Sequence, residues 1–119
     1  MYLLDSNILI YYLDGQKDVL PFVERTISSI FISVISVTEL LAKPSLTKKQ
    51  QTLINNFLSQ FNILDFDITI AHQAAAIKRK YGLTFPDAVL AATAKVFKLN
   101  LVSKDRAFKK VKEVRVMTV

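Results

Sequence analysis

Four carboxylates stand at comparable places in this sequence, each beside apolar residues. Two directly follow short apolar runs, one lies a helical turn after another such run, and one opens a helix; they are Asp5, Glu39, Asp87 and Asp105. Ionised carboxylates gathered in a half-buried place repel one another, and burying unpaired charge is costly. A divalent cation removes that conflict, because Mg²⁺ prefers hard oxygen ligands around an open cleft. One or two such ions can generate hydroxide and stabilise the leaving oxygen in phosphodiester cleavage.

Each acid taken alone also has a structural interpretation. Aspartate is a favoured helix N-cap, and the helix dipole stabilises acids near helix N-termini. Ser36 and Glu39 match a capping box, in which the glutamate bonds back to the backbone of the cap residue. Capping therefore explains any single acid, whereas the set of four favours a metal site.

Other common chemistries lack their residues. The chain has no cysteine, which excludes a disulfide scaffold, a zinc–thiolate site, a cysteine nucleophile and an iron–sulfur cluster. His72 is the only histidine, so a catalytic histidine pair and a multi-histidine metal site are excluded as well. No Gly-x-Ser-x-Gly motif occurs, and two glycines cannot build a phosphate-binding glycine loop.

Strands that alternate with helices must position the four acids. Short apolar and often β-branched runs predict strands at 2–4, 30–34, 63–64, 99–103 and 114–119. Helical spacing and end signals predict helices at 6–13, 18–28, 36–43, 45–61, 67–81, 86–98 and 105–110. This alternation predicts right-handed crossovers and a three-layer α/β/α sandwich with a mostly parallel central sheet of four to five strands. In such a sheet, ligands bind beyond the carboxyl ends of the strands.

Length and composition indicate one domain over residues 1–119. A chain of 119 residues with 51% apolar content can bury its own core, which argues against disorder. No apolar run approaches the ~18 residues that span a bilayer, and the first residues lack the pattern of a secretory leader. We therefore expect a cytoplasmic protein with no membrane partner. The net charge of +6 permits a polyanionic partner without requiring one.

Four segments together resemble the PIN-domain family, and within it the VapC-like toxin ribonucleases of toxin–antitoxin pairs. They are LDSNIL at 4–9, SVTELL at 36–41, FPDAVLAATA at 85–94 and LVSKDRAF at 101–108. They stand in the family's order and span nearly the whole chain, at the family's usual length. Ser6 replaces a frequent threonine, and Ala42-Lys43-Pro44 replaces a glycine that often follows the glutamate helix.

The resemblance implies an endoribonuclease that hydrolyses RNA with Mg²⁺ or Mn²⁺. It assigns catalytic roles to Asp5, Glu39, Asp87 and Asp105, one in each of the four segments. We expect Asp5, Asp87 and Asp105 to bind metal and Glu39 to help hold the ion or orient the attacking water. Asn7 and Ser103 match polar positions that support the site in the family.

The basic residues are concentrated near the C-terminus. The cluster beside Asp105 predicts contacts with RNA phosphates from Lys104, Arg106, Lys109 and Lys110. A second group, Lys78-Arg79-Lys80, is expected to be a solvated face. The apolar face of the 45–61 helix, which carries Leu46, Leu53, Ile54, Phe57 and Phe61, is expected to be core. The resemblance offers another use for that face, since it implies an antitoxin partner and a homodimer.

Three other functions suit a chain of this length and α/β pattern. A receiver domain needs an acidic pair after its first strand, and a haloacid-dehalogenase-type phosphatase needs Asp-x-Asp there; Asp5-Ser6-Asn7 provides neither. A non-catalytic PIN-like module for binding RNA or protein is the remaining alternative. Such a module is expected to lose one or more acids, and all four are present.

Overall fold

The chain forms one five-stranded sheet in which all four pairings are parallel. The structure is a computed structural model that describes all 119 residues. Its strands are β1 (Tyr2–Leu4), β2 (Ile30–Ser33), β3 (Asn62–Leu64), β4 (Asn100–Val102) and β5 (Val116–Met117). They lie in the order β3-β2-β1-β4-β5. The predicted parallel sheet is therefore confirmed, with five strands.

The strand order places a topological switch point between β1 and β4. The chain runs outward from β1 to β2 and β3, and then returns to place β4 on the other side of β1. Leu4 lies opposite Val102 in this pairing, so both strands end at the same level. In open α/β sheets the crevice at a switch point, beyond the carboxyl ends of the strands, is the usual ligand site. Asp5 and Ser103 are the residues that follow these two strands.

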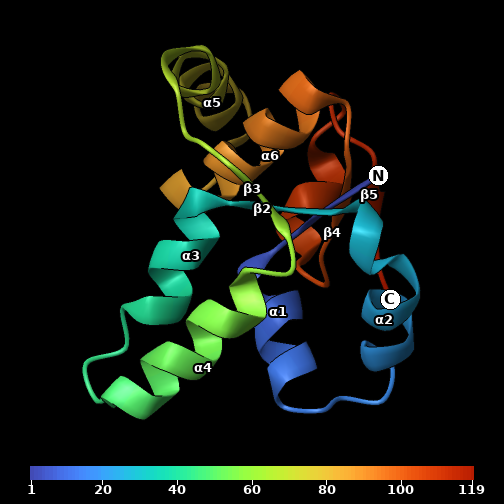
Figure 1. The fold of residues 1–119 in the computed structure, drawn as a ribbon. Helices are drawn as coiled ribbons and strands as arrows, with labels where there is room; N and C mark the ends of the chain where they lie inside the picture. The colour runs from blue at the N-terminus through green and yellow to red at the C-terminus, as the bar shows by residue number, and fades with distance from the viewer.

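Helices cover both faces of the sheet and complete the three layers (Figure 1). They are α1 (Ser6–Leu13), α2 (Leu20–Thr26), α3 (Val34–Leu41), α4 (Lys48–Leu58), α5 (Ile68–Tyr81) and α6 (Phe85–Phe97), with 3₁₀ turns η1 (Ile27–Ser29) and η2 (Arg106–Lys110). Figure 1 shows α5 and α6 on one side of the sheet and α1, α2 and α4 on the other. The predicted α/β/α sandwich is confirmed.

Two hydrophobic cores hold these layers, one on each face of the sheet. Side chains alternate along a strand, so Leu3 packs with α5, α6 and η2, whereas its neighbour Leu4 packs with α1, α2 and α4. In β4, Leu101 and Val102 divide between the two cores in the same way. Because β1 and β4 are buried on both faces, the residues that follow them are held in place.

Helix ends follow their sequence signals where those signals are strong. Asp67 caps α5 by accepting a hydrogen bond from the Ile70 N–H at 2.9 Å. Gly82 ends the same helix in the left-handed conformation (φ 68°), which glycine adopts without steric cost. Thr84 caps α6, and Pro86 occupies its first turn, where its missing N–H costs nothing.

The start of α3 differs from its prediction. The helix begins at Val34, and Ser33 is its N-cap, with Oγ accepting from the Ile35 N–H at 3.2 Å. The predicted capping box of Ser36 and Glu39 is therefore wrong. Ser36 lies inside the helix, fully buried, and its hydroxyl has no hydrogen-bond partner.

Two serine-to-alanine substitutions test this correction through opposite changes in stability. Ser36→Ala removes an unsatisfied buried hydroxyl and is expected to raise the free energy of unfolding by about 1 kcal/mol. Ser33→Ala removes the cap and is expected to lower it by about 1 kcal/mol. Urea unfolding of the two variants measures both changes. A loss at Ser36 with no change at Ser33 would restore the predicted capping box.

The fourth helix is also shorter than predicted. It runs from Lys48 to Leu58 and starts with a capping box formed by Thr47 and Gln50. Phe57 is buried as predicted, but the Leu53 side chain is 60% exposed and is not core. No helix in the structure is long and apolar enough to cross a membrane.

Candidate active site

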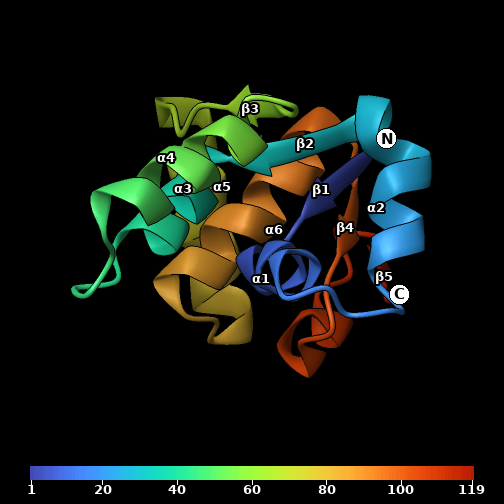
Figure 2. The same cartoon turned by 60° about the horizontal axis from the view of Figure 1, so that its bottom comes forward.

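Asp5 directly follows β1. In the sheet, β1 lies next to β4 (Figure 2). The Asp5 backbone N–H donates to the Val102 carbonyl at 3.1 Å and so extends the pairing of the two strands. The residue is only 5% exposed. Its carboxylate accepts a hydrogen bond from the Ser103 hydroxyl at 2.7 Å, and longer ones of 3.4 Å from the Ser6 hydroxyl and the Asn7 N–H. Asp5 therefore caps α1 and is also held by a side chain from the neighbouring strand.

Ser103 connects two of the predicted acids. Its buried hydroxyl donates to Asp5 and accepts from the Asp105 N–H at 3.0 Å. The Asp105 carboxylate accepts from the Ala107 N–H at 2.9 Å and so caps η2. The Ser103 hydroxyl therefore contacts both the Asp5 carboxylate and the backbone of Asp105.

Asp87 lies in the first turn of α6, three residues after the cap Thr84, and is half-buried. Burial, together with the nearby carboxylates of Asp105, Asp5 and Glu39, raises the pKa of Asp87 to about 6. A hydrogen bond with Thr84 opposes this rise in pKa. The three carboxylates that act on Asp87 are the other three predicted acids. Three acids far apart in the sequence are therefore close enough to Asp87 to raise its pKa.

Glu39 is the most peripheral of the four. It lies on the exposed side of α3. Of the three carboxylates that raise the pKa of Asp87, Glu39 has the smallest effect. It also lines an apolar groove of about 360 Å³ between α1, α3 and α4. Glu39 is therefore placed to extend the acidic site toward that groove.

The donor set fits a divalent cation in its chemistry. All four side chains offer carboxylate oxygens, which are the ligands that Mg²⁺ and Mn²⁺ prefer. Burial is the largest cause of the raised pKa of Asp87, nearby carboxylates add to it, and no cationic side chain is among the groups that lower it. No three histidine, cysteine, aspartate or glutamate side chains lie close enough together to enclose an ion directly. Because Mg²⁺ keeps several of its waters, an open site of this kind is compatible with it.

The two supporting residues behave differently. Ser103 has the predicted contact with Asp5. Asn7 is exposed, and the hydrogen bond that it makes to Asp5 comes from its backbone N–H rather than its side chain. A role for the Asn7 side chain therefore stays a prediction.

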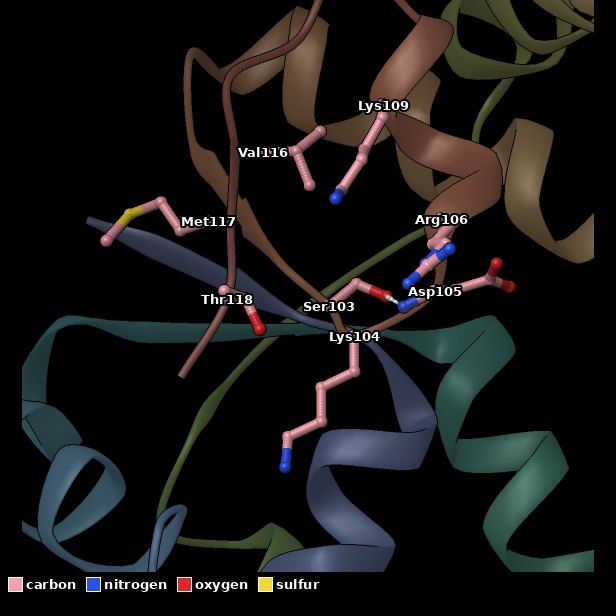
Figure 3. Close-up of a pocket in the computed structure, with 8 residues that line it drawn as sticks. All are labelled: Ser103, Lys104, Asp105, Arg106, Lys109, Val116, Met117 and Thr118. Carbon is pink, nitrogen blue, oxygen red and sulfur yellow. Dashed lines mark hydrogen bonds between the residues drawn. The ribbon is translucent and has the colours of Figure 1, made fainter.

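The four predicted RNA-binding cations lie in three different environments. Arg106 and Lys109 line a cavity of about 180 Å³ beside the acids (Figure 3). Lys104 also lines it, but its ammonium group pairs with Asp18 and lies over the Tyr11 ring at 5.2 Å. Lys110 is exposed and does not line the cavity.

Sequence reasoning missed two features of this region. The pair between Lys104 and Asp18 joins positions 86 residues apart, and no local pattern indicates it. The cavity wall formed by Val116, Met117 and Thr118 depends on the pairing of β5 with β4. The sequence predicts a strand at 114–119, but it does not indicate that this strand pairs with β4.

Comparisons with known proteins agree with this architecture. The family profile of the PIN domain matches residues 2–114. Ribonuclease VapC2 of Methanocaldococcus jannaschii is 28% identical, over 97% of this chain and 91% of that protein. A toxin–antitoxin complex from Klebsiella pneumoniae contains a chain that is 28% identical, with a TM-score of 0.87 and coverage of 99% and 97%. VapBC2 from Rickettsia felis, bound to a promoter DNA fragment, shares the fold with a TM-score of 0.85 at 22% identity, over 99% and 98% of the two chains.

Proposed function

The chain belongs to the PIN domain family, and from this premise we propose that residues 1–119 form one endoribonuclease domain that hydrolyses RNA phosphodiester bonds with a divalent metal ion. The observation that carries the proposal is the placement of the acids: Ser103 joins Asp5 to Asp105 by hydrogen bonds, and Asp87 lies near both. Three further carboxylates from separate elements act on the half-buried Asp87. A structural cap would not require that convergence, whereas a metal-dependent hydrolase does.

Mg²⁺ or Mn²⁺ would be held by Asp5, Asp87 and Asp105, with at least part of this contact made through bound water. When bound, the ion supplies an activated water and stabilises the charge of the leaving oxygen. Ser103 keeps the buried Asp5 carboxylate in one orientation through its 2.7 Å hydrogen bond. Asp105 is held at the same edge by its hydrogen bonds to Ser103 and Ala107.

Glu39 has a different proposed role, because its side chain is exposed. We assign it the orientation of the attacking water and the acceptance of a proton from that water. A carboxylate at the open side of the site is accessible to bulk solvent, so it can release the proton after each turnover.

We also propose that the protein is the toxin of a toxin–antitoxin pair and binds an antitoxin protein. Two relatives of 28% identity support this: one is named a VapC ribonuclease, and the other comes from a toxin–antitoxin complex. The groove between α1, α3 and α4 is a suitable surface, since Ile10 and Leu13 on its rim are exposed. An amphipathic helix that covered this groove would lie beside Glu39.

A homodimer and a cytoplasmic location remain predictions. Exposed apolar side chains at Ile68 and Phe85 on α5 and α6 offer a surface for a second copy. The molar mass in solution would test the dimer.

RNA cleavage with and without metal tests the proposed function. The purified chain is incubated with structured and single-stranded RNA in Mg²⁺, in Mn²⁺ and in excess EDTA. We expect cleavage with either ion and none in EDTA, with recovery when Mg²⁺ is restored. Cleavage that persists in EDTA would contradict the metal dependence. If the protein binds RNA but cleaves none of the RNAs in either metal, the non-catalytic binding module is favoured instead.

A further inference from the structure

A basic cavity lies beside the acidic site, at the carboxyl ends of β4 and β5. It has a volume of about 180 Å³ and is lined by Ser103, Lys104, Asp105, Arg106, Lys109, Val116, Met117 and Thr118. Figure 3 shows these side chains arranged around the last residues of the two strands and the start of η2. The cavity is large enough for a phosphate group with part of its sugar.

Arg106 and Lys109 provide the uncompensated positive charge of this cavity. The structure contains two ion pairs, Lys80 with Glu113 and Lys104 with Asp18, and neither involves these two residues. Figure 3 shows the Lys109 side chain extending from η2 toward the space beside Arg106. The Asp105 carboxylate is directed to the opposite side, where it accepts the Ala107 N–H. The cavity therefore presents two cations to an incoming ligand.

Lys104 serves a different purpose, although it lies in the same segment. Its ammonium group pairs with Asp18, and the hydrogen bond from Lys104 lowers the pKa of Asp18 below its ordinary value. In Figure 3 the Lys104 side chain extends away from Arg106 and Lys109, toward α1. Lys104 thus tethers the segment after β4 to the connection between α1 and α2.

Ser103 joins the cavity to the acidic site. It lines the cavity, and its hydroxyl donates to Asp5 at 2.7 Å. A ligand in the cavity is consequently a close neighbour of a ligand at the carboxylates. The carboxylates repel a polyanion, so a cationic site immediately beside them offsets that repulsion.

We propose that Arg106 and Lys109 bind one backbone phosphate of the RNA strand, adjacent to the phosphate that the carboxylates process. The inference rests on the proposed function and deepens it, because it assigns a substrate subsite. Arginine binds phosphate in a bidentate manner and lysine supplies a point charge, so the pair matches a phosphodiester. Val116, Met117 and Thr118 line another wall of the cavity and carry no charge, so this wall suits the sugar rather than a second phosphate. The site therefore binds one phosphate without reading the base sequence.

The test measures RNA binding in EDTA, where binding is separated from cleavage. The double variant Arg106→Gln, Lys109→Gln is compared with Lys78→Gln, Arg79→Gln, which removes the same two charge types from the exposed end of α5. The probe is a short fluorescein-labelled single-stranded RNA, followed by anisotropy over a series of salt concentrations. We expect the cavity variant to bind about tenfold more weakly. The slope of log affinity against log salt should fall by about 0.7, the value for one single-strand phosphate.

The control variant separates this site from a general effect of charge. Equal weakening in both double variants, or an unchanged salt slope in the cavity variant, would overturn the proposal. Inorganic phosphate and polyglutamate are tested as competitors: if the cavity variant loses affinity for polyglutamate but not for RNA, the cavity is a protein-binding site and the proposal is overturned. If no RNA is cleaved but the cavity variant still loses binding, the subsite stands and the proposed nuclease function fails.

Discussion

Replacing Asp5 with asparagine is expected to lower the rate of RNA cleavage by about a hundredfold or more while the fold is retained. Asp5 is 5% exposed and receives the 2.7 Å hydrogen bond from Ser103. Asparagine has the same shape and is an equally good helix cap, so α1 keeps its start. The Ser103 hydroxyl can rotate to accept from the new amide. The variant therefore removes the charge that a bound cation needs and leaves the local structure in place.

Asp67→Asn is the matched control for this experiment. Asp67 is also an aspartate N-cap and accepts a 2.9 Å hydrogen bond from the Ile70 N–H, but it begins α5 and is not among the carboxylates that raise the pKa of Asp87. Cleavage of a labelled RNA in Mg²⁺ is measured for both variants, with circular dichroism to show that each is folded. Wild-type activity in a folded Asp5→Asn protein would remove Asp5 from the proposed site.

Replacing Asp87 with asparagine is expected to change activity and stability in opposite directions. Cleavage should again fall by about a hundredfold, since a proposed metal ligand is lost. Stability in EDTA at pH 8 should rise, because the Asp87 charge is half-buried among three other carboxylates. After allowance for solvent screening, the gain is about 1 kcal/mol, or about 4 °C in Tm.

The pH dependence of this gain follows from the pKa of Asp87. The pKa rises from 3.8, the value of an unperturbed aspartate, to about 6 in the folded protein. As the pH falls from 7 toward 4, the folded wild type binds a proton before the unfolded chain does, so the wild type becomes more stable. The advantage of the variant is therefore largest above pH 6 and disappears near pH 4. Thermal unfolding from pH 4 to pH 8 measures this, with Asp67→Asn expected to show no gain at pH 8.

A flat difference in Tm between wild type and Asp87→Asn across this pH range would contradict the assigned cause. It would mean that the variant acts through packing or helix capping rather than through the repulsion among carboxylates. An activity loss without any gain in stability would leave the metal-binding role intact, because that role does not depend on the repulsion in the metal-free protein.

Local sequence signals predicted most helix ends, but they failed at α3, where either of two serines could be the N-cap. Asp67 and Gly82 mark the ends of α5 because each makes its contact within the helix itself. Ser33 and Ser36 both suit the start of α3 in sequence. The choice between them depends on where β2 stops pairing, which is at Ser33, opposite Leu64 of β3. A contact with another strand decided that boundary.

The candidate site could be predicted further than its surroundings. Acids that follow strands in an alternating α/β pattern must meet at one edge of a parallel sheet, and the shared environment of Asp87 agrees with that expectation. For the cations of the C-terminal cluster, the sequence could not show which ones form ion pairs and which ones line the cavity. Lys104 and Arg106 are two residues apart, yet one pairs with Asp18 and the other faces a cavity.

The sequence by itself determined the fold class and the family to which the chain belongs, and it predicted the four acids of the candidate site. These properties depend on the residue types, their order and the periodicity of apolar residues, and the sequence shows all three directly. Only the tertiary structure decided that Asp87 is the acid with the raised pKa and that Ser103 donates a hydrogen bond to Asp5. It also decided which cations line the cavity beside the site. Those properties depend on burial and on distances between residues up to 98 positions apart, so packing of the two cores around the sheet determines them.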